Sequence, residues 1–274
     1  MSDNNDQIDY WNGEAGNTWV KAQSRLDTMF EPLTHLALTK ARVTENERVI
    51  DVGCGCGDTS ILIARQGAQV WGIDISEPML EQAKLRAKDL EAVIFSQTDA
   101  ASQEFTDNHD LIFSRFGVMF FSDPVSAFAN LHSGLSESGR LMFMCWEKPS
   151  NNDWISVGAA ALKPFMPQTE TAPDPRAPGP FAFADKNYTE SILNKAGFHN
   201  IQIESASASL NLGKTLDEAV EGQTQVGVLA RILKEVDESL HKPAIAAVRD
   251  ALSNFQTDAG VIMNATVWLV SAEK

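Results

Sequence analysis

The sequence has few cysteines and few basic residues, and both shortages exclude common classes of protein. Its 274 residues include three cysteines, an odd number without a Cys-x-x-Cys pair, so neither a disulfide framework nor a zinc ribbon is indicated. Lysine and arginine number 22 against 37 aspartates and glutamates, a formal net charge of −15. Nucleic acids and anionic membranes attract lysine and arginine. We therefore predict no nucleic-acid partner and no membrane partner.

Long apolar runs and clustered histidines are also missing. No apolar run is long enough to span a membrane, and the start MSDNNDQIDYW is polar and acidic, unlike a signal peptide, so the sequence predicts a cytoplasmic protein. The five histidines are scattered, without an HExxH motif or a Cys/His cluster, and no metal site is predicted. His132 is retained as a catalytic candidate because its helix follows the segment 114–121.

The middle of the chain alternates strand and helix signals. Short β-branched or apolar runs predict buried strands, at residues 48–52, 69–73, 92–95, 111–113 and 141–144. Helices are expected between them: one begins at Asp58, Thr59 or Ser60, and another is capped by Ser76 and runs through Leu90. Strands that alternate with helices form parallel β-α-β units with right-handed crossovers. The pattern predicts an α/β fold, a three-layer sandwich.

The two flanks of this region do not alternate. After Trp146 a proline-rich stretch leads into a second set of elements, predicted as a helix at 188–196, a strand at 201–203, a largely helical segment at 216–255 and a last strand at 265–270. The chain divides into residues 1–44, 45–147 and 148–274, which we interpret as parts of one continuous domain. The helical segment before the last strand is long enough to cover a pocket.

The most informative residues form a glycine-rich loop where the first strand turns into the first helix. The loop reads Asp51-Val-Gly53-Cys-Gly55-Cys-Gly57. Glycines at alternate positions let the backbone approach a ligand closely, and the helix that follows presents unpaired N–H groups. The loop predicts a nucleotide-like ligand, although a tight β-α turn without a ligand would use the same residues.

Two further aspartates strengthen the prediction of a nucleotide site. Asp74 ends the second strand, 23 positions after Asp51 (74 − 51), where nucleotide-binding folds place the acid that receives two ribose hydroxyls. Asp99 follows the third strand on the same carboxyl edge and would accept a hydrogen bond from an exocyclic amine such as that of adenine. A turn aspartate at position 74 and a solvated loop aspartate at position 99 are the alternatives.

The order of these motifs resembles that of the class I S-adenosylmethionine-dependent methyltransferases. The similarity includes the loop 51–57, Asp74, Asp99 and the segment Asp110-Leu-Ile-Phe-Ser-Arg-Phe-Gly117. The resemblance implies a Rossmann-like fold, with a mostly parallel seven-stranded sheet, an antiparallel last strand and a helical cap. It also implies S-adenosyl-L-methionine as the cofactor and S-adenosyl-L-homocysteine as the product.

The resemblance implies roles for individual residues. Residues 45–147 would form the cofactor-binding core, 148–274 the rest of the sheet with the substrate cap, and 1–44 a helical lid. Residues assigned to the cofactor are Trp19, Asp51, Gly53, Gly55, Gly57, Asp74, Ile75, Met79, Asp99, Ala100, Ser114 and Arg115. Residues assigned to the substrate are Tyr10, Phe116, Met119, Phe120, Trp146, Asn152 and Trp154.

Methyl transfer from a sulfonium needs little from catalytic side chains, because the leaving group is already activated and alignment supplies much of the rate. The catalytic candidates are therefore Tyr10, Arg115 and His132, and no general base is identified. Tyr10, Trp11 and Trp19 either belong to a lid over the cofactor or pin a helix to the body. We expect a small-molecule acceptor. A nicotinamide-dependent oxidoreductase and a non-catalytic S-adenosylmethionine-binding protein remain alternatives; the acceptor and the oligomeric state are open.

Overall fold

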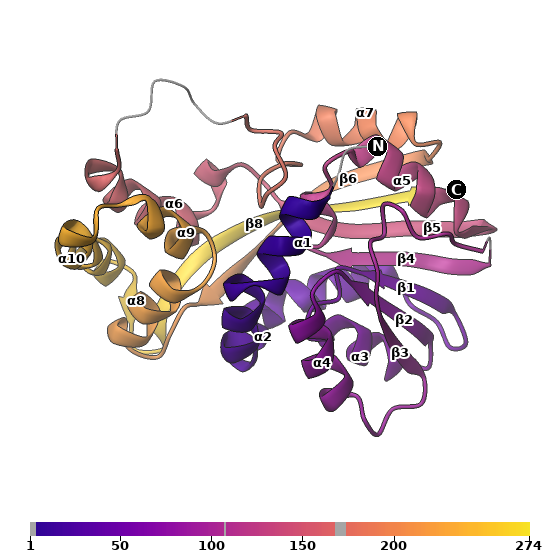
Figure 1. The fold of residues 1–274 in the computed structure, drawn as a ribbon, viewed down its shortest axis with the longest axis horizontal. Helices are drawn as coiled ribbons and strands as arrows, with labels where there is room; N and C mark the ends of the chain where they lie inside the picture. Colours follow the sequence, from indigo (N-terminus) through magenta and orange to yellow (C-terminus); the bar gives the residue numbers. More distant parts are fainter. Residues whose placement is uncertain (1–3, 107, 168–173) are drawn as a thin grey trace.

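The computed structural model describes residues 4–106, 108–167 and 174–274 (Figure 1). Within them, one sheet has the strand order β3-β2-β1-β4-β5-β8-β6, and the two-residue β7 pairs with β8 off that path. Strands β1 to β5 are parallel, and β8 is antiparallel to both of its neighbours. The strands are β1 Arg48–Val52, β2 Gln69–Asp74, β3 Val93–Gln97, β4 His109–Arg115, β5 Leu135–Trp146, β6 His199–Asn211, β7 Gln256–Thr257 and β8 Gly260–Glu273. The predicted α/β fold with an antiparallel last strand is confirmed.

Helices cover both faces of the sheet and give the predicted three layers. Figure 1 shows α2, α3 and α4 on one face and α5 and α7 on the other. The α-helices are α1 Asn5–Asn12, α2 Glu14–Ala41, α3 Asp58–Ala64, α4 Glu77–Arg86, α5 Pro124–Ser133, α6 Asp153–Leu162, α7 Lys186–Lys195, α8 Leu216–Gln225, α9 Val228–Glu235 and α10 His241–Ser253. Across the described ranges, no helix combines the length and apolar character needed to cross a bilayer.

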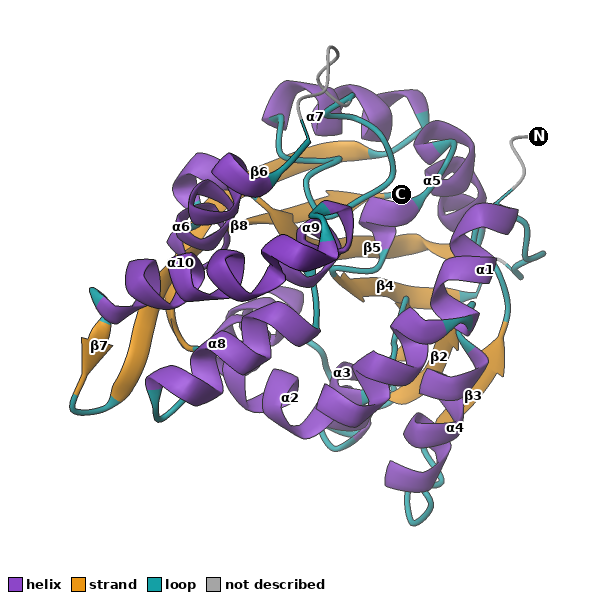
Figure 2. Ribbon diagram, turned by 60° about the vertical axis from the view of Figure 1, so that its left-hand side comes forward, coloured by secondary structure: helices purple, strands orange, loops and turns teal. Residues whose placement is uncertain are grey.

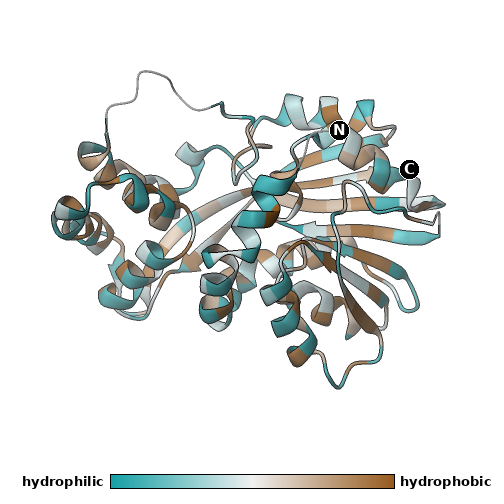
Figure 3. Cartoon of the chain, in the orientation of Figure 1, coloured by the Kyte–Doolittle hydropathy of each residue, from teal (hydrophilic) through white to brown (hydrophobic). Residues whose placement is uncertain are grey.

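The core lies along the central strands. Ile50 of β1, Phe113 of β4 and Phe143 of β5 are fully buried, because the helices on both faces remove these strands from water. Figure 3 shows the apolar residues concentrated in the strands and polar residues toward the outer sides of the helices. The buried central strands place their carboxyl ends, where the loops begin, on a rigid base.

Several predicted boundaries were wrong in an informative way. The helix that begins at Glu77 ends at Arg86 and does not run through Leu90. Ser76 occupies its N-cap position, but its side chain makes no capping bond and donates to the carbonyl of Trp11 at 2.8 Å. The N-cap of α3 is Gly57, not one of the polar residues that follow it. In these places a contact from a distant segment replaces the local capping bond that the sequence indicates.

A helical cap lies beyond the carboxyl edge of the parallel strands. The pairing of β5 with β8 ends at Trp146 and Val267, whereas β6 and β8 remain paired as far as Asn211 and Ile262. This two-stranded extension carries the cap: α6 and α8 pack against β8, and α9 and α10 pack against α6 and α8 (Figures 1 and 2). Both strands are longer than predicted, and the additional residues hold the cap in position.

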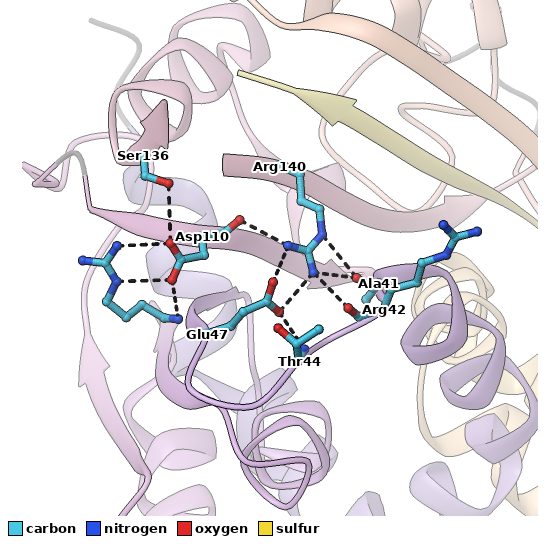
Figure 4. A network of polar contacts seen from close by, with 8 residues as sticks. Ala41, Arg42, Thr44, Glu47, Asp110, Ser136 and Arg140 are labelled. Atoms are coloured by element: carbon cyan, nitrogen blue, oxygen red, sulfur yellow. Dashed lines mark hydrogen bonds and ion pairs between the residues drawn. The ribbon is translucent and has the colours of Figure 1, made fainter. Parts of the chain in front are cut away.

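Arg140 of β5 joins the end of α2 to the opposite, amino edge of the sheet (Figure 4). Its guanidinium donates to the carbonyls of Ala41 at 2.8 Å and Arg42 at 3.3 Å, and to the Glu47 carboxylate at 2.6 Å. Burial raises the pKa of Glu47, but the hydrogen bonds from Arg140 and the Thr44 amide outweigh it and leave that pKa below its usual value. One side chain therefore satisfies both the last carbonyls of a helix and a largely buried acid.

We expect Arg140→Met to destabilise the protein by about 2–3 kcal/mol at neutral pH, because it removes charged hydrogen bonds and leaves Glu47 without its partner. Since the folded pKa of Glu47 is depressed, the loss should shrink as the pH falls through and below that pKa. Urea unfolding of the unmodified protein and of Arg140→Met at several pH values measures this loss of stability. The matched control is Arg48→Met, which breaks a more exposed pair with Asp110 and should change stability much less. Equal effects of the two substitutions would contradict the role assigned to Arg140.

Candidate functional site

The glycine loop between β1 and α3 has a backbone that other residues rarely adopt. Gly53, Gly55 and Gly57 have φ values of +67°, +53° and +79°. A Cβ at Gly53 would lie 2.5 Å from the Cα of Gly117, so the loop after β4 touches the glycine loop backbone to backbone. At Gly55, by contrast, a Cβ would meet only the Met79 side chain, at 3.7 Å. The loop is therefore held at Gly53 by the backbone of Gly117, and it has free space beside Gly55.

Asp51 is a buried carboxylate at the end of β1 with one oxygen unused. Thr59 and Ser60 of α3 donate to its Oδ2 at 2.7 and 2.6 Å. Its Oδ1 is sealed from solvent and, among the described residues, has no hydrogen-bond partner. Burial raises the pKa of Asp51 from 3.8 to about 6, although the two hydroxyls act in the opposite direction. An unpaired carboxylate oxygen at this depth is suited to a cationic donor.

Asp74 joins the glycine loop to the turn that follows β2. Its Oδ2 accepts from the Gly55 amide and its Oδ1 from the Ser76 amide, both at 2.8 Å. Burial raises the pKa of Asp74, and the backbone hydrogen bonds oppose that shift. A carboxylate has about four lone-pair positions, so these two bonds leave it able to accept two more. The carboxylate is 8% exposed as a residue, at the same edge as the loop.

Asp99 and Ala100 follow β3 at the same edge of the sheet. Asp99 accepts from the Ala101 amide at 2.9 Å and from the Asn4 side chain at 3.0 Å. The carbonyl of Ala100 accepts from Asn130 at 2.9 Å. The structure thus brings together the three strand ends at which the sequence places acidic residues. The half-buried Ile75 and buried Met79 lie in the turn and helix after Asp74.

The helix α1 is hydrogen-bonded to this edge, a contact that the sequence did not reveal. Asn12 donates to the Ile75 carbonyl at 2.9 Å and accepts from the Glu77 amide at 2.9 Å. Asn4 reaches Asp99, and the Trp11 carbonyl accepts from Ser76. No residue of α1 is buried, so polar bonds to the predicted cofactor residues hold it there. The only signal in the sequence is Gly13, at the break between α1 and α2.

Arg115 belongs to an ionic network beside the glycine loop. Its guanidinium donates to Asp58, the first residue of α3, at 3.1 Å and to the Thr34 hydroxyl of α2. In the same network Arg86 donates to the Cys56 carbonyl at 2.6 Å and to Asp27 of α2 at 2.7 Å. The network connects α2 to the end of the loop that leads into α3. Sequence reasoning missed Arg86, which lies at the far end of α4.

Ser114 is fully buried and lies between the two loops. Its hydroxyl donates to the Val52 carbonyl at 2.7 Å and accepts from the Gly117 amide at 3.2 Å. These bonds hold the β4 loop against the end of β1. Ser114 therefore positions the backbone that supports the glycine loop, and it does so whether or not a ligand is bound.

Four aromatic side chains gather where β4 and β5 end. The rings of Phe116 and Trp146 are stacked, with centroids 4.1 Å apart and planes 8° from parallel. Phe30 of α2 packs against both of them and against Trp154 of α6. Phe116 has a φ of +67°, a strained conformation for a residue with a side chain, which occurs most often at functional sites. These residues form a continuous aromatic surface from the sheet to the cap.

A second aromatic group connects α1 to the same edge. Trp11 lies edge to face with Tyr10, Trp19 and Phe120, at centroid distances of 5.1, 5.7 and 5.4 Å. Tyr10 is 45% exposed. Met119, next to Phe120 in the short 3-10 helix η1 (Val118–Phe120), is buried in the core. Trp11, which the sequence places in the candidate lid with Tyr10 and Trp19, is the centre of this group.

Two residues assigned from the sequence lie in other surroundings. Asn152 is fully buried, and its side chain bonds both the amide and the carbonyl of Thr266, at 2.9 and 3.0 Å, which fixes α6 to β8. His132 packs edge to face with Phe198 near the start of β5, whereas Trp146 ends that strand. Burial lowers the pKa of His132. The structure does not bring His132 to the edge that holds the glycine loop.

Comparisons with known proteins agree with this geometry. A family model described as a methyltransferase domain matches residues 49–139. Demethylmenaquinone methyltransferase of Staphylococcus saprophyticus is 25% identical over 190 residues, which cover 64% of this chain and 82% of that one.

Solved structures share the fold at low identity. The YcgJ protein of Bacillus subtilis has a TM-score of 0.59 at 18% identity and covers 89% of this chain and 98% of its own. Phosphoethanolamine N-methyltransferase 2 of Haemonchus contortus, solved in complex with S-adenosyl-L-methionine, has a TM-score of 0.59 at 17% identity and covers 100% of this chain and 60% of its own. The domain match and the curated relatives support a class I S-adenosylmethionine-dependent methyltransferase, and the solved structures share its fold.

Proposed function

We propose that this methyltransferase acts on a small molecule bound between the carboxyl edge of the sheet and the helical cap. The observation that carries the proposal is the extension of β6 and β8 past Trp146, because it places four helices over the edge where the glycine loop lies. Open α/β sheets bind ligands at this edge. A cap of this kind encloses a small acceptor more readily than a polymer.

The residues present at the edge fit the cofactor. The unpaired Oδ1 of Asp51 matches the ammonium of the methionine part, and the open space above Gly55 admits the ligand chain. Asp74 has acceptor positions left for two ribose hydroxyls. Asp99 and Ala100 would meet the edge of the adenine, with Ile75 and Met79 beside its ring. The bound cofactor supplies an activated methyl group on a sulfonium.

The protein's own contribution is alignment and exclusion of water. Ser114 and the Gly53–Gly117 contact fix the floor of the site, and the aromatic surface around Phe116 offers an apolar wall for the acceptor. Holding two reactants in line supplies about 7–11 kcal/mol in favourable cases. We propose that residues 1–44 act as the lid, with Trp11, Trp19 and Tyr10 over the cofactor. Arg115 would act through Asp58 and Thr34 by holding the glycine loop.

The relatives named demethylmenaquinone methyltransferase favour a small organic acceptor for this chain too, and the net charge of −15 disfavours DNA or RNA. Incubation with methyl-labelled S-adenosylmethionine and a cell extract split into small-molecule, protein and nucleic-acid fractions tests this. The label should enter the small-molecule fraction, whose product mass spectrometry identifies. Faster transfer to nucleic acid than to every small-molecule fraction would contradict the proposal.

Asp74→Ala should weaken the binding of S-adenosylhomocysteine at least about tenfold, because charged hydrogen bonds to the ribose contribute about 1.5–3 kcal/mol each. Isothermal titration calorimetry measures the affinity, and a parallel titration with NAD should show no binding. The control is Asp89→Ala, which removes an exposed aspartate after α4 and should change nothing. Unchanged affinity in Asp74→Ala, or tighter binding of NAD, would refute the assignment.

A further inference from the structure

The boundary between α2 and α8 holds a buried glutamine whose side chain has no hydrogen-bond partner among the described residues. Gln223 lies on the buried face of α8, one turn after Ala219, and is 6% exposed. Its amide forms no hydrogen bond with any of the residues that the structure describes. Among the described residues, Asp51 Oδ1 is the one side-chain polar atom that is both sealed from solvent and without a hydrogen-bond partner. The Gln223 amide atoms, which also have no partner there, are therefore not sealed from solvent, although the residue as a whole is buried.

Arg25 of α2 lies against the same turn of α8. Its Nη2 donates to the Gly222 carbonyl at 3.3 Å, and a Cβ at Gly222 would lie 1.7 Å from its Nη1. Glycine inside a helix is destabilising relative to alanine, so α8 carries a glycine where this guanidinium needs room. Burial lowers the pKa of Arg25, while the nearby Glu221 acts in the opposite direction. Within the described residues, the guanidinium makes only this one long hydrogen bond.

Arg25 shares helix α2 with Phe30, a member of the aromatic surface. Phe30 follows Arg25 by five residues on α2, about 7.5 Å along the helix axis, and packs against Trp146 and Trp154. In the cap, Leu229 of α9 packs onto Gly158 of α6. Helix α2 thus carries, within two turns, one side chain of the aromatic wall and a guanidinium that reaches α8.

We propose that Arg25 and Gln223 hold the polar end of the methyl acceptor, and that the enzyme prefers planar aromatic acceptors with a singly charged carboxylate. The inference rests on the proposed function, because it places the acceptor under the cap. A guanidinium and an amide together donate to both oxygens of a carboxylate. Glu221 of α8 places a negative charge near this arginine, which disfavours a group with two negative charges.

The test uses the full-length protein saturated with S-adenosylhomocysteine. Calorimetric titrations with 2-naphthoate, 2-naphthamide and 2-naphthyl phosphate compare one aromatic body with three polar ends. We expect naphthoate to bind about tenfold or more tightly than the other two. Arg25→Met and Gln223→Leu should each reduce this preference to about twofold or less. Gly222→Ala should act like Arg25→Met, because the added methyl displaces the guanidinium.

Matched controls separate recognition from folding. Arg231→Met on α9 and Gln225→Leu on α8 change exposed residues of the same types and should keep the preference. All variants should keep the affinity for S-adenosylhomocysteine within about twofold. Equal binding of the three probes, no binding of naphthoate, tighter binding of the phosphate, or a preference that survives Arg25→Met and Gln223→Leu would overturn the subsite. Failure of the unmodified protein to bind S-adenosylhomocysteine would instead refute the proposed function, and the subsite with it.

Discussion

Asp51→Asn is expected to raise the stability of the ligand-free protein by on the order of 3 kcal/mol at about pH 8 and to weaken S-adenosylhomocysteine binding about a hundredfold. The stability effect follows from burial, which raises the pKa of Asp51 from 3.8 to about 6. That difference corresponds to about 3 kcal/mol. Asparagine has a similar shape and carries no charge that must be buried. Thr59 and Ser60 can still donate to its oxygen.

The pH dependence has a definite sign. Between about pH 4 and about pH 6 the folded protein keeps the proton on Asp51 while the unfolded chain loses it. Stability contributed by this group therefore falls as the pH rises through this window and stays low above it. In Asp51→Asn this fall should be absent. Urea unfolding of both proteins at about pH 4, 6 and 8 measures the difference.

The weaker binding expected of Asp51→Asn comes from losing the same charge whose removal stabilises the ligand-free protein. The unpaired Oδ1 of Asp51 is proposed to accept from the ligand's ammonium, and a buried charged hydrogen bond of this kind contributes about 1.5–3 kcal/mol. The affinity of the unmodified protein should rise as the pH increases through about 6, because the carboxylate must be charged to pair. The variant should bind weakly at every pH. Stability and binding therefore conflict at this residue, as is common at functional sites.

Asp110→Asn is the matched control for the stability measurements on Asp51→Asn. The hydrogen bond from Arg48 lowers the pKa of Asp110. The stability that Asp110 contributes is therefore present at pH values above the usual pKa of an aspartate, and it is lost as the pH falls through the lowered pKa. Asp110→Asn should decrease stability at neutral pH and leave ligand affinity unchanged. If Asp51→Asn lowers stability at about pH 8 as well, or binds S-adenosylhomocysteine as tightly as the unmodified protein, the role given to Asp51 is wrong.

The sequence predicted those parts of the fold that depend on local patterns. Buried apolar runs located β1, β2 and β4 to within two residues at either end, because strands covered on both faces are apolar throughout. The glycine loop was also readable, because glycines at three alternate positions are typical of a backbone with positive φ, which all three adopt. The aspartates at 51, 74 and 99 lie at neighbouring strand ends because parallel strands share one carboxyl edge.

What the sequence did not show depends on contacts between distant segments. Ser76 has the residue type of a side-chain cap, yet its hydroxyl bonds the Trp11 carbonyl. Asn152 was assigned to the substrate because it follows β5, but its amide bonds Thr266, more than a hundred residues away. The unpaired amide of Gln223 on α8 carries no motif at all. Hydrogen bonds between segments far apart in the chain leave no local periodicity to read.

Removing residues 1–13 is expected to leave a folded protein that binds S-adenosylhomocysteine about a hundredfold more weakly. No residue of α1 is buried, so its loss removes little of the core and the unfolding transition should barely move. The polar bonds of this segment, however, go to Ile75 and Asp99, which we propose border the cofactor, and to Ser76 and Glu77 in the turn beside them. Calorimetry and urea unfolding of the shortened protein measure the two effects separately.

A point substitution tests the same idea without shortening the chain. Asn12→Ala breaks the two bonds between α1 and the turn after β2 and should weaken binding about tenfold. The control is Asn17→Ala, because the Asn17 side chain bonds only the nearby Gly13 carbonyl in an exposed part of α2.

Hydrogen exchange separates a closing lid from a fixed helix. If α1 and the start of α2 close over the cofactor, S-adenosylhomocysteine should slow exchange across residues 10–23, since in an empty site only a few hydrogen bonds and the Trp11 contacts hold α1. Closure would also exclude water from the reacting sulfonium. Equal exchange with and without ligand, together with full affinity in the shortened protein, would show that Trp11 and Trp19 only pack α1 and α2 against the body.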